Sequence, residues 1–285
     1  MTQETATGQL LATGLHFAEG PRWHNGELWF SDMHAQRVMR LASDGSLHTV
    51  VSVPQDPSGL GWLPDGQLLI VSMRDRKLLR WNGSTLTIHA DLSKLTQYPC
   101  NDMVVDATGR AYVGNFGFDK WGGATPRSAS LICVETNGQA RLVADDLAFP
   151  NGSVITADGK TLIVAESYGG RLTAFEVQDN GDLINRRIWA EVPNDGVPDG
   201  ICLDADGCIW SALPRSKECI RQREGGEITH RIALDQRVFA CMLGGSAGDT
   251  LYVLTAASSD PERCRAQATG RIEAYPAPSP RAGMP

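Results

Sequence analysis

The chain has 285 residues, of which 42% are hydrophobic, and a formal net charge of −7. This length fits one large domain or two ordinary ones, and the apolar fraction is sufficient for a sizeable core. The acidic balance, with no basic stripe along the sequence, argues against a nucleic-acid partner. No apolar run approaches the roughly 20 residues with which a helix spans a bilayer, so no membrane partner is expected.

The N-terminal segment and the cysteines indicate a cellular compartment. Residues 1–9 are polar and lack the basic and apolar segments of a signal peptide. The seven cysteines form no CxxC pair, and their number is odd. We therefore expect a cytoplasmic protein in which reduced thiols mostly fill the core.

Short apolar runs and glycine turns recur along the chain. Each repeat passes through one apolar stretch to a turn glycine and then enters a second apolar stretch; the glycines are residues 26, 66, 109, 159, 207 and 248. Their spacing of 40 to 50 residues is typical of the blades of a β-propeller. The sequence therefore predicts an all-β, six-bladed β-propeller with four antiparallel strands in each blade.

A second hairpin in each repeat supplies the two outer strands of the blade. The predicted pairs are 37–41 with 47–51, 77–81 with 86–90, 130–135 with 140–144, 171–177 with 184–190, and 218–223 with 227–232. Turn dipeptides such as Asn82-Gly83 and Asn180-Gly181 separate the paired strands. No segment shows a convincing helical period, and 91–97 is expected to form at most one short turn.

The last repeat lacks an outer strand on its C-terminal side, because 271–275 is followed by a proline-rich segment. We expect 8–14 to supply this strand, so that an N-terminal strand closes the ring and leaves no open sheet edge. Residues 8–275 are thus predicted to form a single propeller domain. The segment 276–285 is predicted to be a disordered tail.

The first residue of each repeat has the same position ahead of an innermost strand. These residues are Glu19, Ser58, Asn101, Asn151, Asp199 and Ala240. Because all innermost strands run the same way along the central channel, equivalent positions form a ring at one mouth. Four of the six carry hard oxygen donors, and buried carboxylates and amides that face one another need a cation or water. The alternative is that these Asn and Asp residues serve only as turn formers.

The loops that follow the second strand of each blade return to this mouth and should form the wall of a pocket. They contribute His34, Asn115, Phe116 and Tyr168, a mixture that suits a small organic ligand. The loop 116–127 is the longest of them and rich in glycine, so it is a candidate lid.

Four charged or titratable side chains near these loops have both a functional and an ordinary interpretation. His34 is a candidate acid or base, or a surface-loop histidine. Arg74 and Arg215 are candidates for binding an anionic group, or are solvated loop residues. Glu166 is either an extra metal ligand or a residue that caps its strand.

Several motifs resemble the SMP-30/gluconolactonase family, which includes regucalcin and luciferin-regenerating enzyme. They are the segment 17–23 (FAEGPRW), Asn101-Asp102, Pro150-Asn151-Gly152 and Pro198-Asp199-Gly200, and the resemblance covers about residues 10–275. It implies a divalent-metal lactonase in which Glu19, Asn151 and Asp199 bind the metal. It also implies that Asn101 contacts the substrate or completes the metal shell.

One departure from the family pattern bears on the substrate. Sugar lactonases of the family carry an arginine two positions before the asparagine of Asn-Asp, where this chain has Pro99. Together with Phe116 and Phe118, this favours a lactone or ester less polar than a simple aldonolactone. The oxygen donors predict one divalent cation, Ca²⁺ in the first place, with Mg²⁺, Mn²⁺ or Zn²⁺ as alternatives.

The expected reaction is metal-assisted hydrolysis of a lactone or related ester. The cation polarises the carbonyl group, and Asp199 accepts a proton from the attacking water or only steers a water that the metal activates. Two other functions stay open: hydrolysis of a phosphotriester or fluorophosphate, and a non-enzymatic ligand-binding propeller with a calcium plug. The expected partner is the small-molecule substrate, and the protein is expected to be a monomer or a small homo-oligomer.

Overall fold

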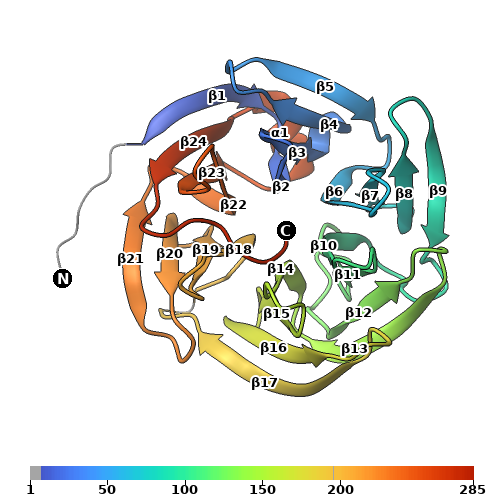
Figure 1. Ribbon diagram of the computed structural model, residues 1–285. Coiled ribbons are helices and arrows are strands. Elements are labelled where there is room, and N and C mark those ends of the chain that lie inside the picture. The colour runs from blue at the N-terminus through green and yellow to red at the C-terminus, as the bar shows by residue number, and fades with distance from the viewer. Residues whose placement is uncertain (1–7, 195) are drawn as a thin grey trace.

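The computed structural model describes residues 8–194 and 196–285. Within them, six four-stranded antiparallel sheets surround a central axis (Figure 1), which confirms the predicted six-bladed β-propeller. The polar segment 1–7, on which the expectation of a cytoplasmic protein partly rests, lies outside the described residues. No helix in the described part of the chain is long and apolar enough to cross a membrane.

The four strands of each blade follow one another in sequence from the axis outward, except in the last blade. The innermost strands are β2 (Ala18–His24), β6 (Pro57–Trp62), β10 (Cys100–Val105), β14 (Pro150–Ile155), β18 (Ile201–Leu203) and β22 (Arg237–Gly244). The second strands are β3 (Glu27–Asp32), β7 (Leu68–Ser72), β11 (Ala111–Asn115), β15 (Thr161–Glu166), β19 (Ile209–Leu213) and β23 (Thr250–Ala256).

The outer two strands of each blade form the periphery and lie close to the predicted hairpins. The third strands are β4 (Arg37–Leu41), β8 (Lys77–Trp81), β12 (Ala129–Val134), β16 (Arg171–Val177), β20 (Glu218–Gln222) and β24 (Gly270–Pro276). The outermost strands are β5 (Leu47–Ser52), β9 (Leu86–Asp91), β13 (Ala140–Leu147), β17 (Leu183–Glu191), β21 (Ile228–Ala233) and β1 (Gln9–Leu15).

The core is concentrated in the inner strands. Every residue of β7, β10, β11 and β14 is buried, whereas most residues of β5 and β17 are exposed or half-buried. This gradient arises because neighbouring blades cover both faces of an inner strand, while an outermost strand faces solvent. All seven cysteines are free and buried, as the sequence predicts.

The ring closes through the N-terminal strand, as the sequence predicts. β1 pairs antiparallel with β24, with Gln9 opposite Ala274 and Leu10 opposite Glu273. The last blade is therefore built from both ends of the chain, in the order β22-β23-β24-β1. This pairing removes the open edge that β24 would otherwise present to solvent.

The prediction of a disordered tail at 276–285 is wrong. The tail crosses the channel mouth opposite the predicted ring, where Met284 and Ile155 exchange two backbone hydrogen bonds of 2.7 and 2.8 Å. The amide of Ala205 donates to the Pro280 carbonyl at 2.8 Å. Figure 1 places the C-terminus near the propeller axis. These bonds to the ends of inner strands compensate the entropy of ordering the tail, which composition alone does not reveal.

One short helix, α1 (Pro261–Gln267), was not expected from the sequence. The side chain of Asp260 caps it by accepting a hydrogen bond of 2.9 Å from the Arg263 amide, and proline occupies its first turn. Seven residues are too few to show a helical period, so the capping pair was the available signal.

Candidate active site

Glu19 and Asp199, which lie far apart in the sequence, meet at the channel mouth. Burial raises the pKa of Glu19 well above its ordinary value, and the charges of Asp199 and Asp102 raise it further. Burial also raises the pKa of Asp199 to about 7, although the nearby charge of Lys120 opposes this shift. Both side chains are half-buried. Two carboxylates within electrostatic reach of each other repel, so the pair favours the binding of a cation.

The two asparagines of the predicted ring are oriented by the protein. Asn151 interacts with the Asp199 carboxylate, and its side-chain nitrogen donates to the Ser167 hydroxyl at 3.1 Å. Ser167 in turn donates to the Pro198 carbonyl at 2.7 Å. The side-chain nitrogen of Asn101 donates to the Pro150 carbonyl at 3.1 Å. Since both amide nitrogens are bound in this way, the amide oxygens are directed away from these protein acceptors.

Glycines allow the inner strands to approach closely at this mouth. A Cβ atom at Gly152 would lie 2.6 Å from the Ile201 nitrogen and 2.7 Å from the Asp199 carbonyl oxygen. The Gly152 amide also donates to that carbonyl at 3.1 Å. Only glycine therefore permits the backbone of Asn151 and that of Asp199 to lie side by side.

A buried arginine links three blades next to the ring. Arg22 donates to the Leu60 carbonyl at 2.8 Å, to the Pro21 carbonyl at 2.8 Å and to the Asp102 carboxylate at 2.7 Å. The Nη2 atom, which binds Asp102, also contacts the Met103 carbonyl. Asp102 is thus neutralised and fixed by Arg22. Sequence reasoning missed this pair, although both residues belong to the motifs that carry the family resemblance.

A cluster of aromatic side chains, which we name the aromatic wall, lies beside the mouth. The Phe116 and Phe149 rings stack with centroids 4.7 Å apart, and Tyr168 lies 5.0 Å from Phe149. Burial raises the pKa of Tyr168, and the charge of Asp199 raises it further, which places the phenol near the carboxylates. The predicted candidates Phe116 and Tyr168 are therefore brought together with Asp199. The side chain of Asn115 is instead bound to the protein, because its nitrogen donates to the Ser130 carbonyl at 2.8 Å.

The other loop candidates have structural partners. His34 is buried, stacks on Phe17 at 5.2 Å, and has its Nδ1 atom 3.7 Å from the Asp56 carboxylate. Arg74 donates to the same carboxylate at 2.6 Å.

Glu166 is also committed to the protein. It accepts hydrogen bonds from Arg171 at 2.9 Å and from the Ala148 amide at 2.7 Å. Arg186 and Thr173 also bind the carboxylate. Of its two interpretations, the structure thus favours the structural one over the metal ligand.

The residues implied as metal ligands have the chemistry that a hard divalent cation requires. Among the described residues, no group of three or more His, Cys, Asp and Glu side chains is placed to hold a metal. The implied set contains only two carboxylates, Glu19 and Asp199, and completes its donors with the amide of Asn151. A divalent cation would relieve the repulsion between the two carboxylates, so the set fits Ca²⁺ or a similar ion.

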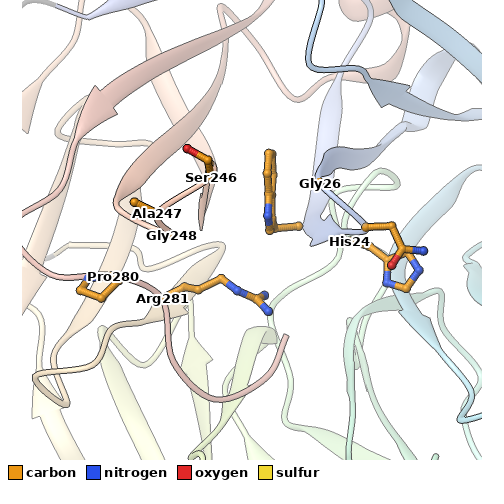
Figure 2. Close-up of a pocket in the computed structure, with 10 residues that line it drawn as sticks. His24, Gly26, Ser246, Ala247, Gly248, Pro280 and Arg281 are labelled. Carbon is orange, nitrogen blue, oxygen red and sulfur yellow. The ribbon is translucent and has the colours of Figure 1, made fainter.

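A cavity of about 500 Å³ lies at the end of the channel opposite the ring. Figure 2 shows it between the turn at His24 and Gly26, the turn 246–248, and Arg281 of the tail. Turn residues and the tail line it, and it contains neither the carboxylate pair nor the aromatic wall. We therefore assign the candidate active site to the ring.

Comparison with known proteins identifies relatives of this chain. A model of the SMP-30/gluconolactonase/LRE-like region matches residues 17–257. Pentonolactonase XacC from Haloferax volcanii is 26% identical over 254 residues, which cover 87% of this chain and 84% of that protein. Regucalcin from Xenopus laevis is 26% identical over 247 residues, covering 84% and 82%. A solved luciferin-regenerating enzyme has a TM-score of 0.83 at 19% identity over 98% of each chain, which shows a shared fold.

Proposed function

The chain belongs to the SMP-30/gluconolactonase/LRE-like family, and from this premise we propose that it is a divalent-metal-dependent lactonase. The relative named as a pentonolactonase supports lactone opening as the reaction. The observation that carries the proposal is the half-buried pair of Glu19 and Asp199 beside Asn151, next to an aromatic wall. A calcium plug alone would not require this wall.

Glu19, Asn151 and Asp199 are the residues that would hold the cation. When bound, the cation supplies electrophilic assistance at the lactone carbonyl. We propose Ca²⁺ as the first choice because every donor is a hard oxygen, with Mg²⁺, Mn²⁺ and Zn²⁺ as alternatives.

Asp199 is the proposed general base. A carboxylate oxygen of Asp199 accepts the proton of the water that attacks the carbonyl carbon, and the amide of Asn151 holds the carboxylate in place. Phe116, Phe149 and Tyr168 exclude bulk water and pack against the lactone ring. Asn101 is proposed to contact another part of the substrate.

A substrate less polar than a simple aldonolactone fits this mouth. Pro99 offers no side-chain hydrogen bond to a sugar hydroxyl, and its carbonyl accepts the Phe116 amide at 3.0 Å. Phe118 lies 5.7 Å from Tyr168 and extends the aromatic wall. We therefore propose an alkyl- or aryl-substituted lactone, or a related ester.

The test is turnover of a lactone panel by wild type and by Asp199→Asn. Aliphatic, aromatic and sugar lactones and an aryl phosphotriester are assayed with each of the four cations in a pH-stat. We expect an apolar lactone to be opened, and the variant to lose about 10²–10⁴-fold in kcat. Asp182→Asn, at an outer-rim carboxylate that is half-exposed, is the control and should retain full activity.

Two results would count against the proposal. If no lactone is opened with any cation while Ca²⁺ still raises the melting temperature, the protein is a calcium-plugged binding module. If the phosphotriester is cleaved faster than every lactone, the protein is a phosphotriesterase on the same scaffold.

A further inference from the structure

Lys120 brings a positive charge to the carboxylate pair. It lies on the loop between β11 and β12, and its ammonium lies over the rings of Phe116 and Phe149, 5.6 and 5.1 Å from their centroids. Burial lowers the pKa of Lys120, and the charges of Asp199 and Glu19 act in the opposite direction. Its charge in turn acts to lower the pKa of both carboxyl groups. The ammonium therefore lies within electrostatic reach of both carboxylates.

The position of this ammonium is set by the aromatic wall. Cation–π contacts with the two rings hold the ammonium in place. Within residues 8–194 and 196–285, Lys120 forms no direct ion pair with a carboxylate. Phe149 comes two residues before Asn151 in the sequence, so one of the rings belongs to the segment that leads into the ring of oxygen donors. The charge is thus fixed beside that ring and keeps its capacity to bind an anion.

The charges at the mouth show what this lysine changes. Glu19, Asp199 and Asp102 contribute three negative charges, and Arg22 and Lys120 contribute two positive ones. With all three carboxyl groups ionised, the mouth would have a net charge of −1, which becomes +1 when a divalent cation binds. Without Lys120 the cation-loaded mouth would be neutral. With Lys120, the mouth that holds the cation has one net positive charge and can therefore bind one negative charge.

We propose that Lys120 is a further catalytic residue, whose ammonium stabilises the negative charge that develops on the lactone carbonyl oxygen. This role rests on the proposed lactonase function. Water forms a bond to the carbonyl carbon, the carbonyl π electrons move to the oxygen that faces Lys120, and the proton of the water goes to Asp199. The ring C–O bond then breaks, and the leaving oxygen receives that proton. The carboxyl group formed in this way releases its proton to solvent, and the resulting carboxylate of the hydroxy-acid product keeps the contact with Lys120.

The test compares Lys120→Met, which keeps the length of the side chain, with Lys120→Arg, which keeps the charge. Lys94→Met, at an exposed lysine, is the control. For a neutral lactone, we expect Lys120→Met to lose about 10²–10³-fold in kcat, as for the loss of an oxyanion donor, with KM changed less than threefold. Lys120→Arg should recover at least tenfold of this loss, and Lys94→Met should match wild type.

Two binding measurements test the charge of Lys120 without any turnover of substrate. In calorimetric titrations, Lys120→Met should bind the hydroxy-acid product at least tenfold more weakly than wild type. It should bind Ca²⁺ severalfold more tightly in the absence of product, because a repelling charge has been removed. A variant that kept both wild-type kcat and wild-type product affinity would overturn this role while leaving the lactonase proposal intact. A wild type that opens no lactone would instead remove the reaction on which the role rests.

Discussion

Replacing Arg22 by methionine should destabilise the protein more than any surface substitution, because the guanidinium joins three blades. Arg22 is 4% exposed and Asp102 is 8% exposed. The substitution removes the hydrogen bonds to the Leu60 and Pro21 carbonyls and leaves the Asp102 carboxylate buried without its partner. Breaking a buried ion pair in this way costs about 3–5 kcal/mol. Each carbonyl left unsatisfied adds about 1 kcal/mol or more.

Urea denaturation, followed by circular dichroism, measures this cost. The control is Arg187→Met, which removes an ion pair with Glu224 in which both side chains are about half-exposed. We expect less than about 1 kcal/mol for the control. The double variant Arg22→Met/Asp102→Leu should recover part of the loss, since it removes the unpaired charge.

The same variants test whether Arg22 supports the carboxylate pair. Asp102 lies within electrostatic reach of Glu19 and Asp199, so its unpaired charge adds to their repulsion in Arg22→Met. The reasoning fails if Arg22→Met costs less than 1 kcal/mol. It also fails if the double variant is destabilised by the sum of both single changes, because the residues would then be energetically independent.

Two other substitutions separate stability from activity. Gly152→Ala and Gly61→Ala should each cost about 1–3 kcal/mol; only Gly152→Ala should also lose about 10²-fold in kcat/KM. Its Cβ would meet the Asp199 backbone, whereas that of Gly61 meets the Val105 side chain; equal kcat/KM would contradict this account. Burial acts to raise the pKa of Glu166, but bonds from Arg171 and other donors outweigh it and lower the pKa below its ordinary 4.5. Glu166→Gln should therefore cost about 2–3 kcal/mol at pH 7, and this difference should shrink as pH falls below about 4.5; a pH-independent difference in melting curves would be evidence against it.

Much of the fold is predictable because a propeller repeats one local pattern. The turn glycines determine the phase of the repeat, and that phase assigns Glu19, Asn151 and Asp199 to equivalent positions. The closing role of β1 follows from the missing strand in the last repeat. These predictions need only local spacing and the rule that a sheet edge is covered.

What the sequence does not reveal depends on contacts between blades. The link from Arg22 to Asp102 crosses from the first blade to the third, and no local pattern reports it. Lys120 comes within electrostatic reach of the carboxylates through the path of an irregular loop. The tail 276–285 has a composition typical of disorder, but it binds strand ends that are available only in the folded ring.

The pairing of β1 with β24 also affects how the protein matures on the ribosome. β1 is the first strand to be synthesised, and its partner, Gly270–Pro276, emerges only after the other blades. Such a pairing of high sequence separation forms late and slowly. Glu19 in the first blade and Asp199 in the fifth face each other across the channel only when the sixth blade joins them. Catalytic competence should therefore be acquired in the last step of folding, and a nascent chain that lacks β24 would carry Glu19 and Asp199 without a finished centre.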